Sequence, residues 1–343
     1  MSVRPLAILG TGLVTSVGLS AAASCSAFRA KITNPFETRF IDSGGAWIMA
    51  HQVELERPWP GLNKLAKMAA LAIGEALADL DKGQWHRLPL LLCVAEAERP
   101  GRMTGLDDRL LPLIQTDLGV TFAPSSAVVP EGRVSVAVAL AQARALLASS
   151  NIPGVLIVGA DSLLSWPTLS HYERADRLLT ESNSNGFMPG EGAGALWVGA
   201  GRRGAPLMWC TGIGFGREPA HIDSGKPLRA DGLTQAIKAS LDDAGRQLHE
   251  LDFRITDNSG EQYYFKEAAL AISRTLRQRK EVFDIWHPAE CTGETGAASG
   301  VAVIATADDA CRKGYSPGPH VLSHWANDAG QRAAVTLQYR AMA

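Results

Sequence analysis

Four side chains in the second half of the chain could bind a metal ion or exchange protons: His287, Glu294, His320 and His324. Among them, only His320 and His324 have the spacing that places two ligands on one face of a helix. The residues between these two histidines are largely apolar and follow Pro319, which is typical of a strand. We therefore expect histidines of the core or the surface, and the sequence predicts no metal site.

A second candidate is a pair of carboxylates, Glu261 and Glu267, on either side of the aromatic residues 263–265. Paired carboxylates could perform acid–base catalysis. Because the dipole of a helix stabilises acids near its N-terminus, we expect Glu261 and Glu267 to be ordinary acids at the start of a helix. The aromatic residues are expected in the core or at an interface rather than as a platform for stacking bases.

The composition indicates an ordinary globular protein. The chain has 343 residues, of which 46% are hydrophobic and 20% charged, and its formal net charge is -2. This length fits one large domain or two closely packed ones, and the charge balance argues against binding to nucleic acid. No apolar run reaches the roughly 18 residues of a membrane span. The five cysteines show no CxxC spacing, so we expect neither disulfides nor zinc, and a cytoplasmic location: Cys25, Cys93, Cys210, Cys291 and Cys311.

Short apolar runs alternate with segments whose apolar residues have helical spacing, which predicts an α/β protein. Strands are expected at residues 90–94, 127–129, 155–158, 195–198, 207–213 and 333–337. Helices are expected at residues 62–80, 134–148, 233–244 and 266–279. The stretch 95–119 is the least regular and is expected to leave the core.

The N-terminal residues faintly look like an export signal that ends in a lipidated cysteine, Cys25. Gly10, Thr11 and Gly12 interrupt the apolar run, so we expect instead a strand at residues 6–9, a tight glycine turn and the start of a helix. Residues 210–216 repeat this glycine-rich pattern, which is compatible with two half-chain repeats joined near residues 199–205.

The glycine-rich stretch 186–196, with the sequence GFMPGEGAGAL, resembles a signature of the β-ketoacyl synthases, the condensing enzymes of the thiolase fold. Gly-Ala-Asp at 159–161 and Arg-Leu-Leu at 177–179 precede it in the family's order and spacing, and residues 6–18 and 35–42 are similar to the family's first segments. The resemblance implies two pseudo-repeated halves, residues 1–205 and 206–343, in five layers ordered α-β-α-β-α. It also implies a two-fold homodimer in which the strand at 126–130 pairs with its symmetry mate.

The residues that carry condensation chemistry in that family are replaced here. At the family's spacing, Arg133 stands at the position of the nucleophilic cysteine, and a guanidinium cannot attack a thioester. Ser259 and Glu294 stand at the positions of the two histidines, and an ionised carboxylate would repel an oxyanion. The nearest serine, Ser135, is expected to face elsewhere on the helix. Residues 323–330 also depart from the family's glycine-rich Asn-Ser-Phe-Gly-Phe-Gly-Gly motif.

These replacements favour a catalytically inactive protein that binds, scaffolds or assists another. The resemblance implies a chain-length-factor-like subunit beside an active synthase, or an accessory protein of a secretion cluster, so the expected partners are a second copy, a synthase, a carrier protein or a secreted effector. The alternative is an acyltransferase or another enzyme in which Arg133, Ser259 and Glu294 form a new site for an acyl or carboxylate ligand. No cofactor is expected in either case.

The opposite charges of Arg133 and Glu294 predict a contact. The family brings these two positions together around one substrate atom, so we expect an ion pair that closes the cleft, with Ser259 or Glu131 as a further partner. The alternative is that both side chains point to solvent.

Overall fold

The computed structural model describes residues 5–201 and 205–341. Ten strands are hydrogen-bonded in the order β10-β9-β11-β12-β8-β1-β7-β6-β4-β5, and β2 and β3 form a separate hairpin. The strands are β1 (Leu6–Val14), β2 (Phe36–Ile41), β3 (Trp47–Ala50), β4 (Leu90–Cys93), β5 (Ala127–Val129), β6 (Val155–Ser162), β7 (Glu191–Gly199), β8 (Leu207–Arg217), β9 (Phe253–Thr256), β10 (Ile285–Trp286), β11 (His320–Ala326) and β12 (Gln331–Arg340). The helices are α1 (Ala21–Ala30), α2 (Gly61–Ala76), α3 (Leu110–Leu118), α4 (Ser135–Ser149), α5 (Trp166–Arg174), α6 (Asp231–Ala244), α7 (Gln262–Thr275), α8 (Ala289–Thr292) and α9 (Ser299–Arg312).

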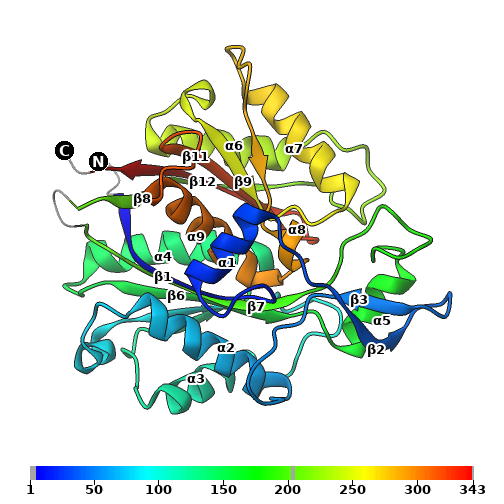
Figure 1. Ribbon diagram of the computed structural model, residues 1–343. Helices are drawn as coiled ribbons and strands as arrows, with labels where there is room; N and C mark the ends of the chain where they lie inside the picture. Colours follow the sequence, from blue (N-terminus) through cyan, green and yellow to red (C-terminus); the bar gives the residue numbers. More distant parts are fainter. Residues whose placement is uncertain (1–4, 202–204, 342–343) are drawn as a thin grey trace.

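The strands form two sheet layers with helices outside and between them (Figure 1). Helices α2 and α3 cover the layer of β1, β7, β6, β4 and β5, and α6 and α7 cover the layer of β8, β12, β11, β9 and β10. Helices α4 and α9 lie between the two layers. The layers are joined where β1 pairs antiparallel with β8, from Leu6 opposite Cys210 to Ile8 opposite Met208. This arrangement confirms the predicted five-layered α/β fold.

Matching glycines in β1 and β8 show the repeat in atomic detail. A Cβ atom on Gly12 would lie 2.0 Å from the carbonyl oxygen of Ala72 in α2, and one on Gly214 would lie 2.1 Å from the carbonyl oxygen of Ala236 in α6. Glycine at these positions therefore lets each outer helix pack directly against the strand backbone. The predicted tight turn at residues 10–12 is wrong, because β1 continues through these glycines to Val14.

The core contains the two central helices. Almost every side chain of α9 is buried, and Val301 and Ile304 belong to the same apolar cluster as Val136 and Leu140 of α4. Because both sheets pack on these helices, the segments that lead into α4 and α9 are held firmly from both sides. These two segments carry the candidate site.

The predicted strands are present, and the differences lie mainly at the ends of elements. Helix α7 spans Gln262–Thr275 rather than 266–279, because the side-chain Oδ1 of Asn185 accepts a hydrogen bond from the Gln262 backbone N–H at the start of the helix. The irregular stretch 95–119 contains α3. Residues 202–204, next to the predicted boundary at 205/206, lie outside the described residues. Of the helices described, none is long and apolar enough to cross a membrane.

Candidate functional site

Gly132 places Arg133 at the mouth of the cleft between the halves. Its φ is +56°, and a Cβ atom there would lie 2.1 Å from a carboxylate oxygen of Glu96, so this sharp turn favours glycine. A short 3-10 turn from Gly132 to Val134 follows, and α4 begins at Ser135. Gly296, with φ +55°, makes the equivalent turn before α9. The two halves therefore bring Arg133 and Glu294 into the same cleft.

Arg133 and Glu294 form a buried ion pair, as predicted. Arg133 Nη1 lies 3.1 Å from Glu294 Oε2, and the side chains are 9% and 7% exposed. Ser259 Oγ donates to the same carboxylate oxygen at 3.0 Å, and the Gly296 backbone N–H donates to Glu294 Oε1 at 2.9 Å. The structure thus brings the three sequence-predicted residues together.

Glu131, the other expected partner, is not part of this contact. Its carboxylate accepts a hydrogen bond from Gln331 Nε2 at 2.7 Å. Glu131 precedes the left-handed turn at Gly132, which sends the two flanking side chains in different directions. This part of the prediction is wrong.

Two further carboxylates and a tyrosine surround Arg133. Its Nη2 lies 3.1 Å from Asp328 Oδ1, and its Nε lies 3.8 Å from Asp257 Oδ2. The guanidinium carbon is 4.4 Å from the centre of the Tyr264 ring, which is close enough for a cation–π interaction. Asp328 belongs to the turn between β11 and β12, so this hairpin is tied directly to the cleft.

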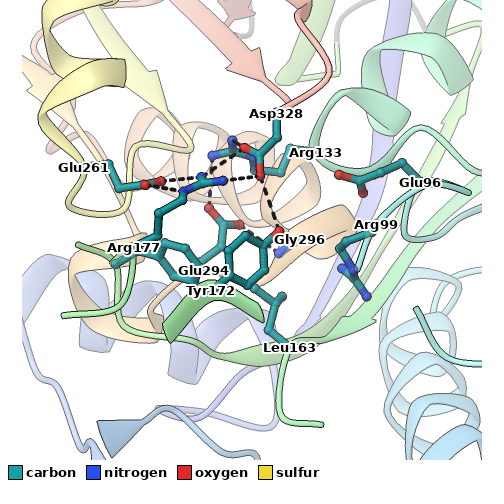
Figure 2. A pocket seen from close by; sticks show the side chains of 11 residues that line it. Glu96, Arg99, Arg133, Leu163, Tyr172, Arg177, Glu261, Glu294, Gly296 and Asp328 are labelled. Atoms are coloured by element: carbon teal, nitrogen blue, oxygen red, sulfur yellow. Dashed lines mark hydrogen bonds and ion pairs between the residues drawn. The ribbon is translucent and has the colours of Figure 1, made fainter. Parts of the chain in front are cut away.

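Arg177 is a second arginine of the same cluster (Figure 2). It binds Glu261 through Nε and Nη2 at 2.7 and 2.9 Å, and its Nη1 lies 2.7 Å from Asp328 Oδ2. The Tyr172 hydroxyl donates to the same Asp328 oxygen at 3.3 Å. Asp328 is therefore shared by two arginines, and charge-assisted contacts of this kind are among the strongest in proteins.

The cluster holds two guanidinium groups and four carboxyl groups, which are those of Glu294, Asp257, Asp328 and Glu261. Burial raises the pKa of Glu294 to about 7 and that of Asp257 to about 6, and Arg133 offsets only part of each rise. Burial also raises the pKa of Asp328, but Arg133 and Arg177 outweigh it and hold this pKa well below its usual range. Near neutral pH, part of the excess acid is therefore held as protonated Glu294 rather than as uncompensated charge.

Little space remains between these side chains. The cavity lined by the cluster residues other than Asp257, together with Arg99 and Glu96, measures about 20 Å³, which is room for about one water molecule. Arg99 is itself held by Asp161, the last residue of the Gly-Ala-Asp motif, through contacts of 2.6 and 2.8 Å. An acyl substrate could reach Glu294 only after this cluster rearranges.

The proposed pairing of Glu261 with Glu267 is not observed, because each carboxylate binds a different arginine. Glu261 is the N-cap residue of α7, but its carboxylate contacts Arg177 and makes no capping hydrogen bond to the helix. Glu267 binds Arg332 Nε at 2.8 and 2.9 Å, and both side chains are fully buried. Glu261 thus stands at the start of a helix as expected, Glu267 lies beyond its first turn, and both residues have buried ion-pair partners.

Neither the nearest hydroxyl nor the thiols are activated. Ser135 is fully buried, and its Oγ donates to the Val129 carbonyl at 3.0 Å and accepts from the Glu131 backbone N–H at 3.0 Å, so it faces away from the cleft as expected. All five cysteines are buried and unpaired. Burial raises the pKa of Cys25 and Cys210 to about 12 and that of Cys291 and Cys311 to about 11, and it also raises that of Cys93. These thiols stay protonated near neutral pH, which makes them poor nucleophiles.

The histidines considered at the outset do not converge. His320 and His324 lie in strand β11, as the sequence indicates, and His320 Nδ1 is 3.3 Å from Asp252. Within residues 5–201 and 205–341, no group of three or more His, Cys, Asp or Glu side chains could hold a metal ion.

Sequence reasoning missed most partners of Arg133. Asp257 lies two residues before Ser259, and Asp328 lies in the stretch that departs from the family's motif. Arg177 belongs to a motif that carried the resemblance. The acids in these segments were the available signal, but only the fold shows that the segments meet around Arg133.

Comparisons with known proteins agree with this fold. No family model matches the sequence. The chain is 31% identical over 168 residues to a curated protein named "Putative polyketide beta-ketoacyl synthase 2" from Streptomyces coelicolor, and the match covers 46% of this chain and 39% of that protein. The chain therefore corresponds to less than half of that relative's length.

Solved structures match over almost the whole chain. The ishigamide ketosynthase/chain length factor has a TM-score of 0.81 at 19% identity, with 98% of this chain and 99% of that chain covered. A ketosynthase in complex with its chain length factor from Xenorhabdus doucetiae has a TM-score of 0.76 at 12% identity, with 98% of each chain covered. The resemblance to β-ketoacyl synthases is thus confirmed, and the chain has the thiolase-like fold of ketosynthases and chain length factors.

Proposed function

We propose that this protein is a catalytically inactive relative of the ketosynthases that acts as a chain-length-factor-like subunit. The observation that carries the proposal is the environment of Arg133: the residue at the nucleophile position is a guanidinium locked to Glu294 and Asp328. A guanidinium stays protonated in proteins and offers no lone pair for attack on a thioester.

The two other catalytic positions support the same conclusion. An oxyanion hole needs hydrogen-bond donors aimed at the developing negative charge. Ser259 Oγ already donates to Glu294, and the Glu294 carboxylate, when ionised, can only accept. The three positions therefore satisfy one another instead of presenting groups to a substrate.

The first expected result is that the protein forms no acyl-enzyme. Incubation with acyl-CoA or an acylated carrier protein, followed by intact-mass measurement, should show the unmodified mass. The Arg133 guanidinium cannot attack the carbonyl carbon of a thioester, and all five thiols are buried and protonated. An active ketosynthase treated in parallel verifies the reagents. A stoichiometric adduct on any cysteine, on Ser135 or on Ser259 would instead favour the alternative, an acyltransferase with a rebuilt site.

The open edge of β5, the last strand of its sheet, is a surface that a partner could use. Val129 directs its carbonyl toward β4, where it accepts from the Val94 backbone N–H. Because successive residues of a strand alternate in direction, the N–H and carbonyl of Val128 face the open edge. An unpaired edge of this kind is suited to pairing with a second chain, so we propose a two-fold assembly through β5, with a second copy or with an active synthase.

The second expected result is that Val128→Pro abolishes this assembly. Proline removes the outward N–H of Val128 and leaves the β4–β5 hydrogen bonds in place. Light scattering during size-exclusion chromatography should show the wild-type protein as a dimer and Val128→Pro as a monomer with unchanged circular dichroism. Val128→Ala, which keeps the N–H, is the matched control and should remain dimeric. A wild-type protein that is monomeric at micromolar concentration both alone and when mixed with a synthase from the same gene cluster contradicts the assembly.

The choice between partners is tested by co-expression. A chain-length-factor-like subunit should form a one-to-one complex with a neighbouring synthase, whereas an accessory protein of a secretion cluster should bind an effector instead. The five unpaired cysteines also support a reducing compartment, which is the reason for proposing a cytoplasmic location.

A further inference from the structure

A second cavity lies away from the charged cleft, between α1, α8, β10 and the C-terminal side of α9. Lys31, just after α1, pairs with Glu290 of α8 at this place, and both helices are labelled in Figure 1. The cavity measures about 330 Å³, which is within the range of sites for small organic ligands. Its size and its lining differ from those of the closed cleft around Arg133.

Flat aromatic rings form the walls of this cavity. Trp286 and Tyr315 are nearly parallel, with an angle of 17° and ring centres 6.4 Å apart. Phe253 packs behind Trp286 at a centroid distance of 4.6 Å and fixes its ring, and the buried Phe28 lines another side. Parallel rigid rings of this kind favour a planar apolar ligand over a branched one.

The rim of the cavity carries excess positive charge. Arg29 and Lys31 line it, and Glu290 is the one carboxylate among the described lining residues. The Arg29 guanidinium lies 4.4 Å from the centre of the Tyr315 ring and forms no ion pair with the residues that the structure describes. The Lys31–Glu290 pair is long, at 3.5 Å, and exposed, so water already weakens it. An anionic group at this rim would find a cation that is free to bind it.

His287 offers one more polar contact. It lines the cavity, and its Nδ1 atom is buried without a hydrogen-bond partner in the described part of the chain. A ligand that supplies a hydrogen-bond partner to this atom would bind more tightly, because an unpaired buried polar atom is unfavourable.

We propose that this cavity binds a small planar aromatic carboxylate. The ring lies against Phe28, Trp286 and Tyr315, and the carboxylate faces Arg29 and Lys31. The argument rests on the lining of this cavity alone, so it is independent of the function proposed for the cleft.

Calorimetric titration with 2-naphthoate tests the ligand class. We expect saturable one-to-one binding with a Kd on the order of 0.1 mM, as is usual for a ligand of this size. The neutral 2-naphthamide, which has the same ring, should bind about tenfold more weakly, because it cannot pair with Arg29. Octanoate, an anion without a ring, should also bind about tenfold more weakly. Equal affinities for the three compounds, or no saturable binding of 2-naphthoate up to about 5 mM, would overturn the proposal.

Variants then locate the site. Arg29→Gln changes an exposed side chain and should weaken 2-naphthoate binding about tenfold while it leaves 2-naphthamide binding unchanged. Trp286→Leu should remove detectable binding, because the largest aromatic surface that the ligand ring contacts is lost. Trp166→Leu, at an exposed tryptophan elsewhere, is the matched control and should bind like the wild type. Loss of binding in Trp166→Leu, or wild-type affinity in Arg29→Gln, would place the ligand elsewhere and refute the site.

Discussion

Replacing Arg133 with alanine is expected to lower the free energy of unfolding by about 3–5 kcal/mol, the usual effect of removing one partner of a buried ion pair. The substitution leaves Glu294 and Asp257 buried without their guanidinium. It also removes the packing of the guanidinium on Tyr264. Denaturant unfolding at neutral pH measures the change.

A double-mutant cycle isolates the ion pair. Arg133→Ala combined with Glu294→Ala should destabilise the protein less than the sum of the two single substitutions, by about 1–3 kcal/mol, because the second change removes the carboxylate that the first leaves unpaired. Arg246→Ala is the matched control, since the side chains of its pair with Glu250 are 34% and 37% exposed. It should lower the free energy of unfolding by less than about 1 kcal/mol. Additive effects of the Arg133 and Glu294 substitutions would mean that the pair does not hold the cleft closed.

The second large effect is expected in the dependence of stability on pH. Glu294 has a pKa near 4.5 when unfolded and about 7 when folded, so the folded protein holds a proton here that the unfolded chain releases. This stabilising contribution is fully present below pH 4.5 and is lost as the pH rises through 7. Acidification from pH 7.5 to 5 should therefore stabilise the wild type by about 2–3 kcal/mol relative to Glu294→Gln, which cannot titrate.

The comparison with Glu294→Gln is needed because buried histidines act in the opposite direction. Burial lowers the pKa of His51 from 6.5 to about 4 and lowers that of His324 further, so their contributions are lost as the pH falls. The wild type and Glu294→Gln both contain these histidines, so the difference between their pH profiles of stability is due to Glu294. Ser259→Ala removes a hydrogen bond to the Glu294 carboxylate but no titrating group. Its free energy of unfolding should therefore change with pH almost as steeply as that of the wild type. Parallel pH profiles for the wild type and Glu294→Gln would show that Glu294 is already ionised in the folded protein at pH 5.

The contact between Arg133 and Glu294 could be predicted because the glycine motifs fix the register of the chain along a known fold. These two residues are 161 positions apart, and only the resemblance links them. Local patterns located most strands for a different reason, since buried strands are short apolar runs between polar residues. The division of the chain at 205/206 remains a prediction.

What could not be predicted depends on close contacts between distant segments. Gly10 and Gly12 look like a turn in the sequence, yet they lie within strand β1. Glycine is needed there because backbone carbonyl groups of α2 occupy the space that a side chain would fill. Asp328 meets Arg133 across 195 residues and Arg177 across 151, and no local pattern marks it as their partner. Such charge clusters form only where the fold brings segments from distant parts of the sequence into contact.

The sharing of Asp328 between two arginines also bears on how this sequence can change over evolutionary time. A single substitution of Arg133 by cysteine would leave Glu294 and Asp257 buried without a guanidinium and would remove one of the two arginines that bind Asp328. The acids would have to be replaced before the arginine, and each such step would itself leave a cation less well paired. Any route to a nucleophile at this position therefore crosses less stable intermediates, so the order of substitutions, rather than their number, limits it.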